Sequence, residues 1–72
     1  MTTQWREICT NHNLSPREMQ IAELMCEGLK PAEIAEKLDI SVYTAYKHIS
    51  NIYKKMSIRS QIELLSTLML TP

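Results

Sequence analysis

The feature that most limits the fold is a break of only three residues, Asp39-Ile40-Ser41, between two segments with helical apolar spacing. The segment before the break has three apolar residues on one face, namely Ile34, Ala35 and Leu38. The segment after it has four apolar residues at the same period, namely Ala45, Ile49, Ile52 and Met56. Two helices joined by so short a turn must pack against each other, so the pattern predicts a helix-turn-helix unit.

Signals for the starts and ends of helices divide the rest of the chain into short segments. Ser15 and Glu18 have the spacing of a capping box, and Pro16 lies where the first helical turn needs no N–H. A helix is therefore expected from about Pro16 to about Glu27, and the single glycine of the chain, Gly28, is expected to end it.

Further helices are expected after this one. A short helix leads into the three-residue break, and Ser41 is expected to cap a helix over about 42–56 by accepting the amide proton of Thr44. Ser60 and Glu63 have the spacing of another capping box. The helix that follows has more apolar residues than one face requires: Ile62, Leu64, Leu65, Leu68, Met69 and Leu70.

Residues 1–13 form a polar lead-in in which Trp5, Ile8 and Cys9 have helical spacing. This segment is either a short extra helix or the stub of a linker. Behind it, one all-α domain of four helices is expected over residues 14–72. The composition agrees with this fold class, because strong helix formers are frequent while glycine occurs once and phenylalanine never.

Charge is unevenly placed along a chain whose formal net charge is zero. All eight acidic residues lie outside the range 40–62. Within that range lie the basic or titratable side chains of Lys47, His48, Lys54, Lys55 and Arg59. A basic segment without acids is typical of nucleic-acid binding, but the charge alone fits a solvated helix face equally well.

The helix over 42–56 is expected to turn its apolar residues to the core. The opposite, exposed face then carries Tyr43, Tyr46, Lys47, Ser50 and Lys54. The major groove of DNA is about 12 Å wide and admits an α-helix. The helix-turn-helix pattern therefore predicts that this face meets the bases, while the helix before it braces the complex across the DNA backbone.

A series of spaced positions adds a family resemblance to this pattern. These positions are Leu14-Ser15-Pro16-Arg17-Glu18, Gly28, Glu33-Ile34-Ala35, Leu38, Ile40-Ser41, Thr44, His48, Ile52, Lys55-Met56, Ile58 and Ser60. Together they resemble the LuxR/GerE/NarL-type helix-turn-helix domain of bacterial transcription regulators, over about residues 14–70. The resemblance implies a four-helix domain whose third helix recognises DNA, a role in transcription control, and dimerisation that often uses the last helix.

Individual contacts with DNA follow from the exposed face and the resemblance. The side chains expected at base edges are Tyr43, Tyr46, Lys47 and Ser50. Those expected at phosphates, which give affinity without sequence information, are Thr44, Lys54 and Lys55. For Tyr43 and Tyr46 three roles stay open: packing on thymine methyl groups, hydrogen bonding to phosphate, or covering the edge of the core. His48 is expected to be a hydrogen-bonded, part-buried residue.

One segment departs from the family pattern. The family usually has Thr-Val-Lys/Arg-x-His where this chain reads Thr44-Ala45-Tyr46-Lys47-His48. Tyr46 therefore replaces the basic residue that commonly touches DNA, and Lys47 lies about 100° further around the helix. Ser60-Gln61 likewise replaces a frequent Ser-Arg. Because of these departures, the DNA sequence that this chain recognises and its affinity for DNA are expected to differ from those typical of the family.

The resemblance implies double-stranded DNA, a second copy of the chain and RNA polymerase as partners, in the cytoplasm at the nucleoid. The residues expected to pair two copies through the last helix are Ile62, Leu65, Leu68 and Met69. The alternative is a protein–protein interaction module that pairs this helix with another regulator and binds DNA weakly. The zero net charge and the missing basic residue at Tyr46 favour the alternative.

Enzymes, cofactors, metals and membranes are not expected. A structural zinc site needs four ligands. The candidate ligands are Cys9, His12, Cys26 and His48, and among them only Cys9 and His12 lie close together in the sequence. A small helical domain offers little room for a catalytic pocket. Charged residues interrupt every apolar run well before the roughly 18 positions of a membrane span. A cytosolic protein with reduced thiols is therefore expected.

Overall fold

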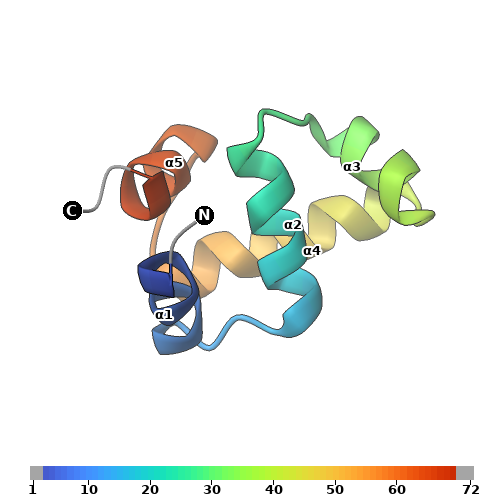
Figure 1. Cartoon of the computed structure of the whole chain (residues 1–72). Coiled ribbons are helices and arrows are strands. Elements are labelled where there is room, and N and C mark those ends of the chain that lie inside the picture. Colours follow the sequence, from blue (N-terminus) through green and yellow to red (C-terminus); the bar gives the residue numbers. More distant parts are fainter. Residues whose placement is uncertain (1–2, 70–72) are drawn as a thin grey trace.

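The computed structural model describes residues 3–69, and within this range five helices make up the regular secondary structure (Figure 1). They are α1 (Thr3–Asn11), α2 (Pro16–Cys26), α3 (Pro31–Leu38), α4 (Val42–Met56) and α5 (Gln61–Met69). The all-α prediction is confirmed, and the N-terminal segment forms a helix. Leu70, which the apolar pattern assigned to the last helix, lies outside the described residues.

The longest helix, α4, is the element around which the others are arranged. It packs against both α2 and α3, while α5 packs on α2 and α1 packs on α5. Figure 1 shows α2 crossing in front of α4, with α3 beside the N-terminal end of α4 and with α1 and α5 near its other end. One face of α4 is therefore enclosed by neighbours, and the opposite face is left open.

The buried face of α4 is the one that the apolar spacing predicts. Ala45, Ile49, Ile52 and Met56 are all buried there. Ile49, Ile52 and Met56 belong to one continuous core cluster, which also contains Trp5 and Cys9 of α1. The helix α1 is therefore part of the same packed unit as the four helices after it, and not a separate linker.

The helices begin where their capping residues predict. The Ser15 hydroxyl accepts the Glu18 N–H at 3.1 Å, and the Glu18 carboxylate accepts the Ser15 N–H at 2.8 Å, which is a complete capping box. Ahead of α5 the box is shifted: Ser60 accepts from the Glu63 N–H at 3.3 Å, but Glu63 accepts from the N–H of Arg59 at 2.8 Å. Both arrangements satisfy amides that a helix start leaves unpaired.

Four helices end on the same turn, in which one residue adopts a left-handed conformation and the next is apolar. The left-handed residues are Asn13, Gly28, Asp39 and Ser57, with φ of 62°, 95°, 56° and 56°. The N–H of each following residue closes the turn onto the helix, as in the bond of Ile40 to Ala35 O at 3.0 Å. The turn at Asp39 is what lets α3 and α4 follow one another across three residues.

Candidate nucleic-acid interface

The open face of α4 carries the five side chains predicted there: Tyr43, Tyr46, Lys47, Ser50 and Lys54, here called the α4 stripe. All five are exposed, and the two aromatic rings are unusually so, at 72% for Tyr43 and 57% for Tyr46. Residues three, four and seven positions apart share one face of a helix, which is why these side chains align. The exposure of Tyr43 excludes the role of covering the edge of the core.

A cation–π contact joins two members of the stripe within one turn. The Lys47 ammonium lies 5.7 Å from the centroid of the Tyr43 ring. Such contacts contribute about 0.5–1 kcal/mol at exposed sites. The contact limits the orientations of both side chains, so a positive charge is held close to an aromatic face at the N-terminal half of α4.

A shallow hollow of about 260 Å³ lies along one edge of the stripe. Tyr46 and Ser50 form one wall of it. The remaining walls come from Met25, Leu29, Pro31, Ile49, Tyr53 and Gln61. The Gln61 side chain donates a hydrogen bond to the Met25 carbonyl at 3.2 Å and so ties the start of α5 to α2. Burial raises the pKa of the Tyr53 phenol.

The first turn of α4 fixes Thr44, one of the residues expected at phosphate. The Ser41 hydroxyl accepts the Thr44 N–H at 3.0 Å, as predicted, and donates to the Thr44 side-chain oxygen at 2.9 Å. A threonine hydroxyl has one proton and two lone pairs. This hydroxyl pair holds the Thr44 side chain at the start of α4.

Lys55 lies in a different setting from the one expected of a phosphate contact. Its ammonium forms an ion pair with the Glu18 carboxylate at 2.7 Å and a hydrogen bond to the Asn13 carbonyl at 3.1 Å. Burial would raise the pKa of Glu18, but the hydrogen bond and charge of Lys55 and the bonds from Ser15 outweigh it and lower the pKa. Lys55 therefore joins the end of α4 to the start of α2, although its side chain is still 38% exposed, while the neighbouring Lys54 lies on the α4 stripe.

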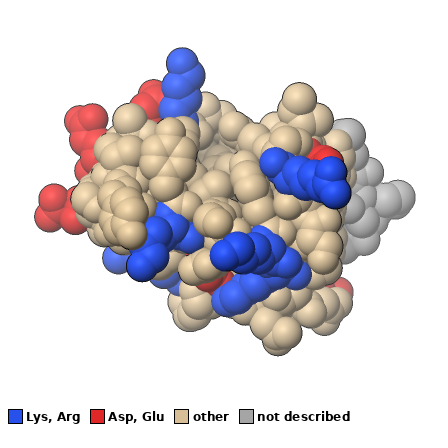
Figure 2. All heavy atoms as spheres, turned by 180° about the vertical axis from the view of Figure 1, so that it is seen from behind, with Lys and Arg blue, Asp and Glu red and all other residues tan. Residues whose placement is uncertain are grey.

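The face seen in Figure 2 is the reverse of that in Figure 1, and α4 lies on this side of α2. Basic side chains stand out over the middle and lower part of this face, and acidic ones gather mainly at one edge. A surface of this kind attracts a polyanion even though the whole chain is neutral.

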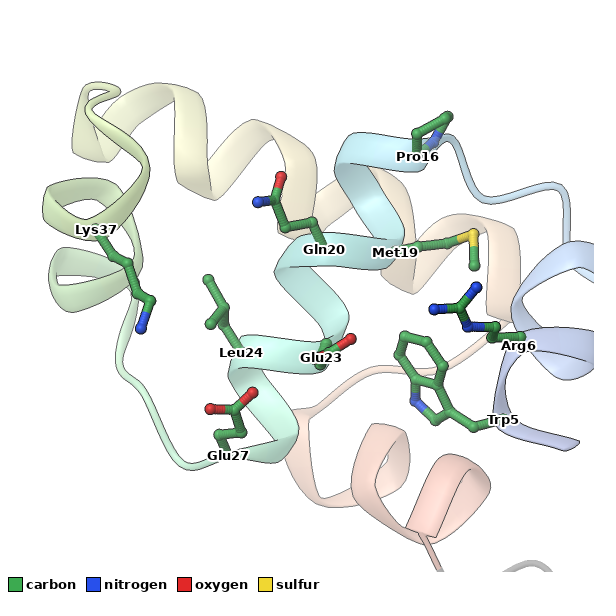
Figure 3. A pocket seen from close by; sticks show the side chains of 9 residues that line it. All are labelled: Trp5, Arg6, Pro16, Met19, Gln20, Glu23, Leu24, Glu27 and Lys37. Atoms are coloured by element: carbon green, nitrogen blue, oxygen red, sulfur yellow. The ribbon is translucent and has the colours of Figure 1, made fainter. Parts of the chain in front are cut away.

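A second, larger hollow of about 600 Å³ lies between α1, α2 and α3 (Figure 3). Figure 3 shows the ribbon of α4 passing behind α2, away from the labelled side chains. Two carboxylates, Glu23 and Glu27, line this hollow together with Arg6 and Lys37. Because the two carboxylates offset the two cations, this hollow does not extend the basic surface of α4.

The helix α5 exposes part of its apolar surface. Ile62 is 75% exposed and Met69 is 53% exposed, while Leu65 is half-buried. Leu68, which was grouped with them in the predicted subunit contact, is 6% exposed and belongs to the core together with Leu64. The free apolar surface of α5 is therefore formed by three of the four residues expected there.

The cysteine and histidine residues do not gather into a ligand set. Among residues 3–69, no group of three or more His, Cys, Asp and Glu side chains has metal-binding geometry. Cys9 and Cys26 are free thiols, and burial, aided by the proximity of Cys26, raises the pKa of Cys9 to about 11. A thiol with such a pKa is a weak nucleophile. No helix in the described part of the chain is long and apolar enough to cross a membrane.

Comparison with known proteins agrees with this architecture. The family model described as bacterial regulatory proteins, luxR family, matches residues 12–68. The nitrate/nitrite response regulator protein NarL of Escherichia coli K12 is 38% identical over 52 residues, which are 72% of this chain and 24% of that protein. The oxygen regulatory protein NreC of Staphylococcus carnosus is 43% identical over 51 residues, or 71% of this chain and 24% of that protein.

A third relative, the fimbriae Z protein of Escherichia coli K12, is 44% identical over 52 residues, or 72% of this chain and 25% of that protein. The chain thus spans about a quarter of the length of these three relatives. No solved structure shows significant similarity to it. The match of the family model to residues 12–68, on a helix-turn-helix whose second helix exposes a basic stripe, places the chain in the LuxR family of bacterial regulatory proteins.

Proposed function

We propose that the chain binds duplex DNA in transcription regulation by laying the α4 stripe in the major groove. The observation that carries the proposal is the open face of α4, on which exposed side chains follow one another without an acidic residue. The width of the major groove fits an α-helix. Family membership supports the same role, since this family consists of regulatory proteins and not of a class of enzymes.

The proposal assigns different tasks to the two halves of the stripe. Tyr43, Tyr46, Lys47 and Ser50 meet base edges, because the N-terminal residues of a recognition helix lie deepest in the groove. Lys54 lies near the last turn of α4 and meets a phosphate, as does the Thr44 hydroxyl. Lys55 contributes by holding α4 against α2, and its contact with phosphate stays a prediction.

Substitution of the two stripe lysines tests this division of tasks. In Lys47→Ala, binding to a duplex selected from a random pool is expected to weaken by about 1–3 kcal/mol and the base preference to relax. In Lys54→Ala, binding to all duplexes is expected to weaken by the same amount. The slope of log affinity against log salt concentration should become shallower by about one. Fluorescence anisotropy with the selected and a scrambled duplex measures both effects. Identical behaviour of the two variants would contradict the assigned tasks.

A homodimer formed through α5 is part of the proposal. Ile62, Leu65 and Met69 supply an apolar surface that a single copy leaves partly exposed. Apolar surface of this kind gains free energy when a partner covers it. Sedimentation velocity of Ile62→Glu against the wild type tests it: the variant is expected to sediment as a monomer at concentrations where the wild type forms a dimer. If the wild type stays monomeric at high concentration, the proposed homodimer is overturned.

The alternative function uses the same α5 surface toward another regulator, with weak DNA binding. The exposure of Ile62 favours it as much as it favours a homodimer. The two functions differ in the demand that they make on α4, because only DNA binding requires the basic stripe. RNA polymerase, another proposed partner, would be met by surfaces that stay outside the groove.

A further inference from the structure

We propose that Tyr43 and Tyr46 read DNA through the 5-methyl groups that pyrimidines present in the major groove, so that the domain favours thymine over cytosine. This inference rests on the proposed insertion of α4 into the groove. It names the chemical feature of the DNA that the stripe recognises.

The hydrogen-bonding inventory of the stripe is the first argument. Bidentate bonds to base edges are made by Arg or Lys to guanine and by Asn or Gln to adenine. In the N-terminal half of the stripe, Lys47 is the one residue of these types. Two of its three neighbours there are aromatic, so most of the surface that meets the bases is an apolar ring.

The exposure of the two rings is the second argument. Tyr43 and Tyr46 lie three residues apart on one face, and their exposed fractions are 72% and 57%. A phenol that bonds phosphate through its hydroxyl alone does not require its ring to be exposed to this extent. Apolar side chains that meet thymine methyl groups in the major groove are a known mode of base recognition, and they gain free energy by excluding water.

The surroundings of the two rings are the third argument. The Lys47 ammonium, 5.7 Å from the centroid of the Tyr43 ring, covers one face of that ring and leaves the other face open. Tyr46 lines the same hollow as Ile49 and Tyr53, at the edge of the stripe. The Tyr43 ring is thus partly preorganised, and preorganisation reduces the entropy lost on binding.

Removal and addition of the methyl group test the inference directly. One pair of probes is an A·T-rich duplex of about 20 base pairs, which is two helical turns, and the same duplex with deoxyuridine in place of every thymidine. The other pair is a G·C-rich duplex with cytosine and the same duplex with 5-methylcytosine. Fluorescence anisotropy of the intact chain measures the affinities. Each methyl group contacted is worth about fourfold in affinity. With one methyl group contacted by each ring, the expected result is roughly a fifteenfold loss with deoxyuridine and a gain with 5-methylcytosine.

Two variants separate the rings from the hydroxyls. In Tyr43→Ser/Tyr46→Ser, thymidine and deoxyuridine duplexes are expected to bind alike, because the methyl groups have lost their partners. In Tyr43→Phe/Tyr46→Phe, which keeps the rings, the full methyl effect is expected to persist. Both sites are exposed, and thermal unfolding confirms that each variant is folded.

The outcomes distinguish the inference from the proposed function. Salt-dependent binding with equal affinity for thymidine and deoxyuridine duplexes overturns methyl readout and leaves DNA binding intact. A methyl effect that survives in the double serine variant also overturns it, because the effect would then come from the flexibility of the duplex. Loss of binding in the double phenylalanine variant assigns the tyrosines to phosphate instead. Absence of binding to every duplex overturns both proposals.

Discussion

Replacement of Ile52 by alanine is expected to lower the free energy of unfolding by about 2–5 kcal/mol. Ile52 is fully buried at the centre of the inner face of α4, in the cluster that joins α4 to its neighbours. A domain of this size has a total stability of about 4–11 kcal/mol. The substitution therefore removes a large part of it, and urea denaturation followed by circular dichroism measures the loss.

The same substitution at Ile62 is the matched control, at a protein concentration low enough for the wild type to be monomeric. Ile62 lies on α5 with 75% of its surface exposed in the single chain, so Ile62→Ala leaves no cavity there. Its free energy of unfolding is expected to stay within about 0.5 kcal/mol of the wild type under these conditions. Similar losses at both sites would show that the core is not centred on α4.

The second large effect is expected when Lys55 is replaced by methionine. This change keeps the length of the side chain but leaves the Glu18 carboxylate, whose side chain is 6% exposed, without its cation. Loss of one partner of a buried pair costs about 3–5 kcal/mol, whereas exposed pairs contribute little. Because the Lys55 side chain is 38% exposed, the expected loss at neutral pH is about 1–2 kcal/mol.

The dependence of stability on pH gives this prediction a distinct signature. Since the pKa of Glu18 is lower in the folded chain than its usual value of 4.5, the ionised carboxylate stabilises the fold above pH 4.5. That contribution is lost as the pH falls through the folded pKa. In Lys55→Met the decline below pH 4.5 should be shallower than in the wild type, while the control Lys54→Met should follow the wild type. An unchanged decline in Lys55→Met would contradict the role of the ion pair.

Sequence patterns predicted the boundaries of α4 because the signals lie next to each other in the chain. Ser41 accepts the amide proton of Thr44 three residues away, and the apolar period then fixes which face is buried. Such local chemistry needs no knowledge of the tertiary fold. For the same reason the start of α2 at Pro16 was predictable.

Contacts between distant residues were beyond these patterns. Lys55 and Glu18 are 37 residues apart, and nothing near either of them shows that they meet. Apolar spacing in α5 likewise did not separate Leu68, which is buried, from Ile62, which is exposed. When apolar residues cover more than one face, the buried face is decided by the neighbouring helix, here α2.

The ends of the helices show a second feature that local sequence patterns do not predict. Gly28 was expected to stop α2 because glycine adopts positive φ without strain. Asp39 and Ser57 adopt the same conformation with φ of 56°, although their side chains disfavour it. The hydrogen bond from the N–H of the residue after each of them offsets part of that cost. After Ser57, the side chain of Ile58 also packs against the core, and this packing is a property of the whole domain.

The measurement that bears most directly on DNA binding is a titration of the chain into random-sequence duplex at two salt concentrations, about 50 mM and about 200 mM. If the α4 stripe neutralises two or three phosphates, the affinity is expected to fall by about tenfold or more between them, because counterions are released. Binding of this kind justifies a search for the operator. Absence of binding even at the lower salt concentration would contradict DNA recognition by α4 and would leave α5 as the functional surface.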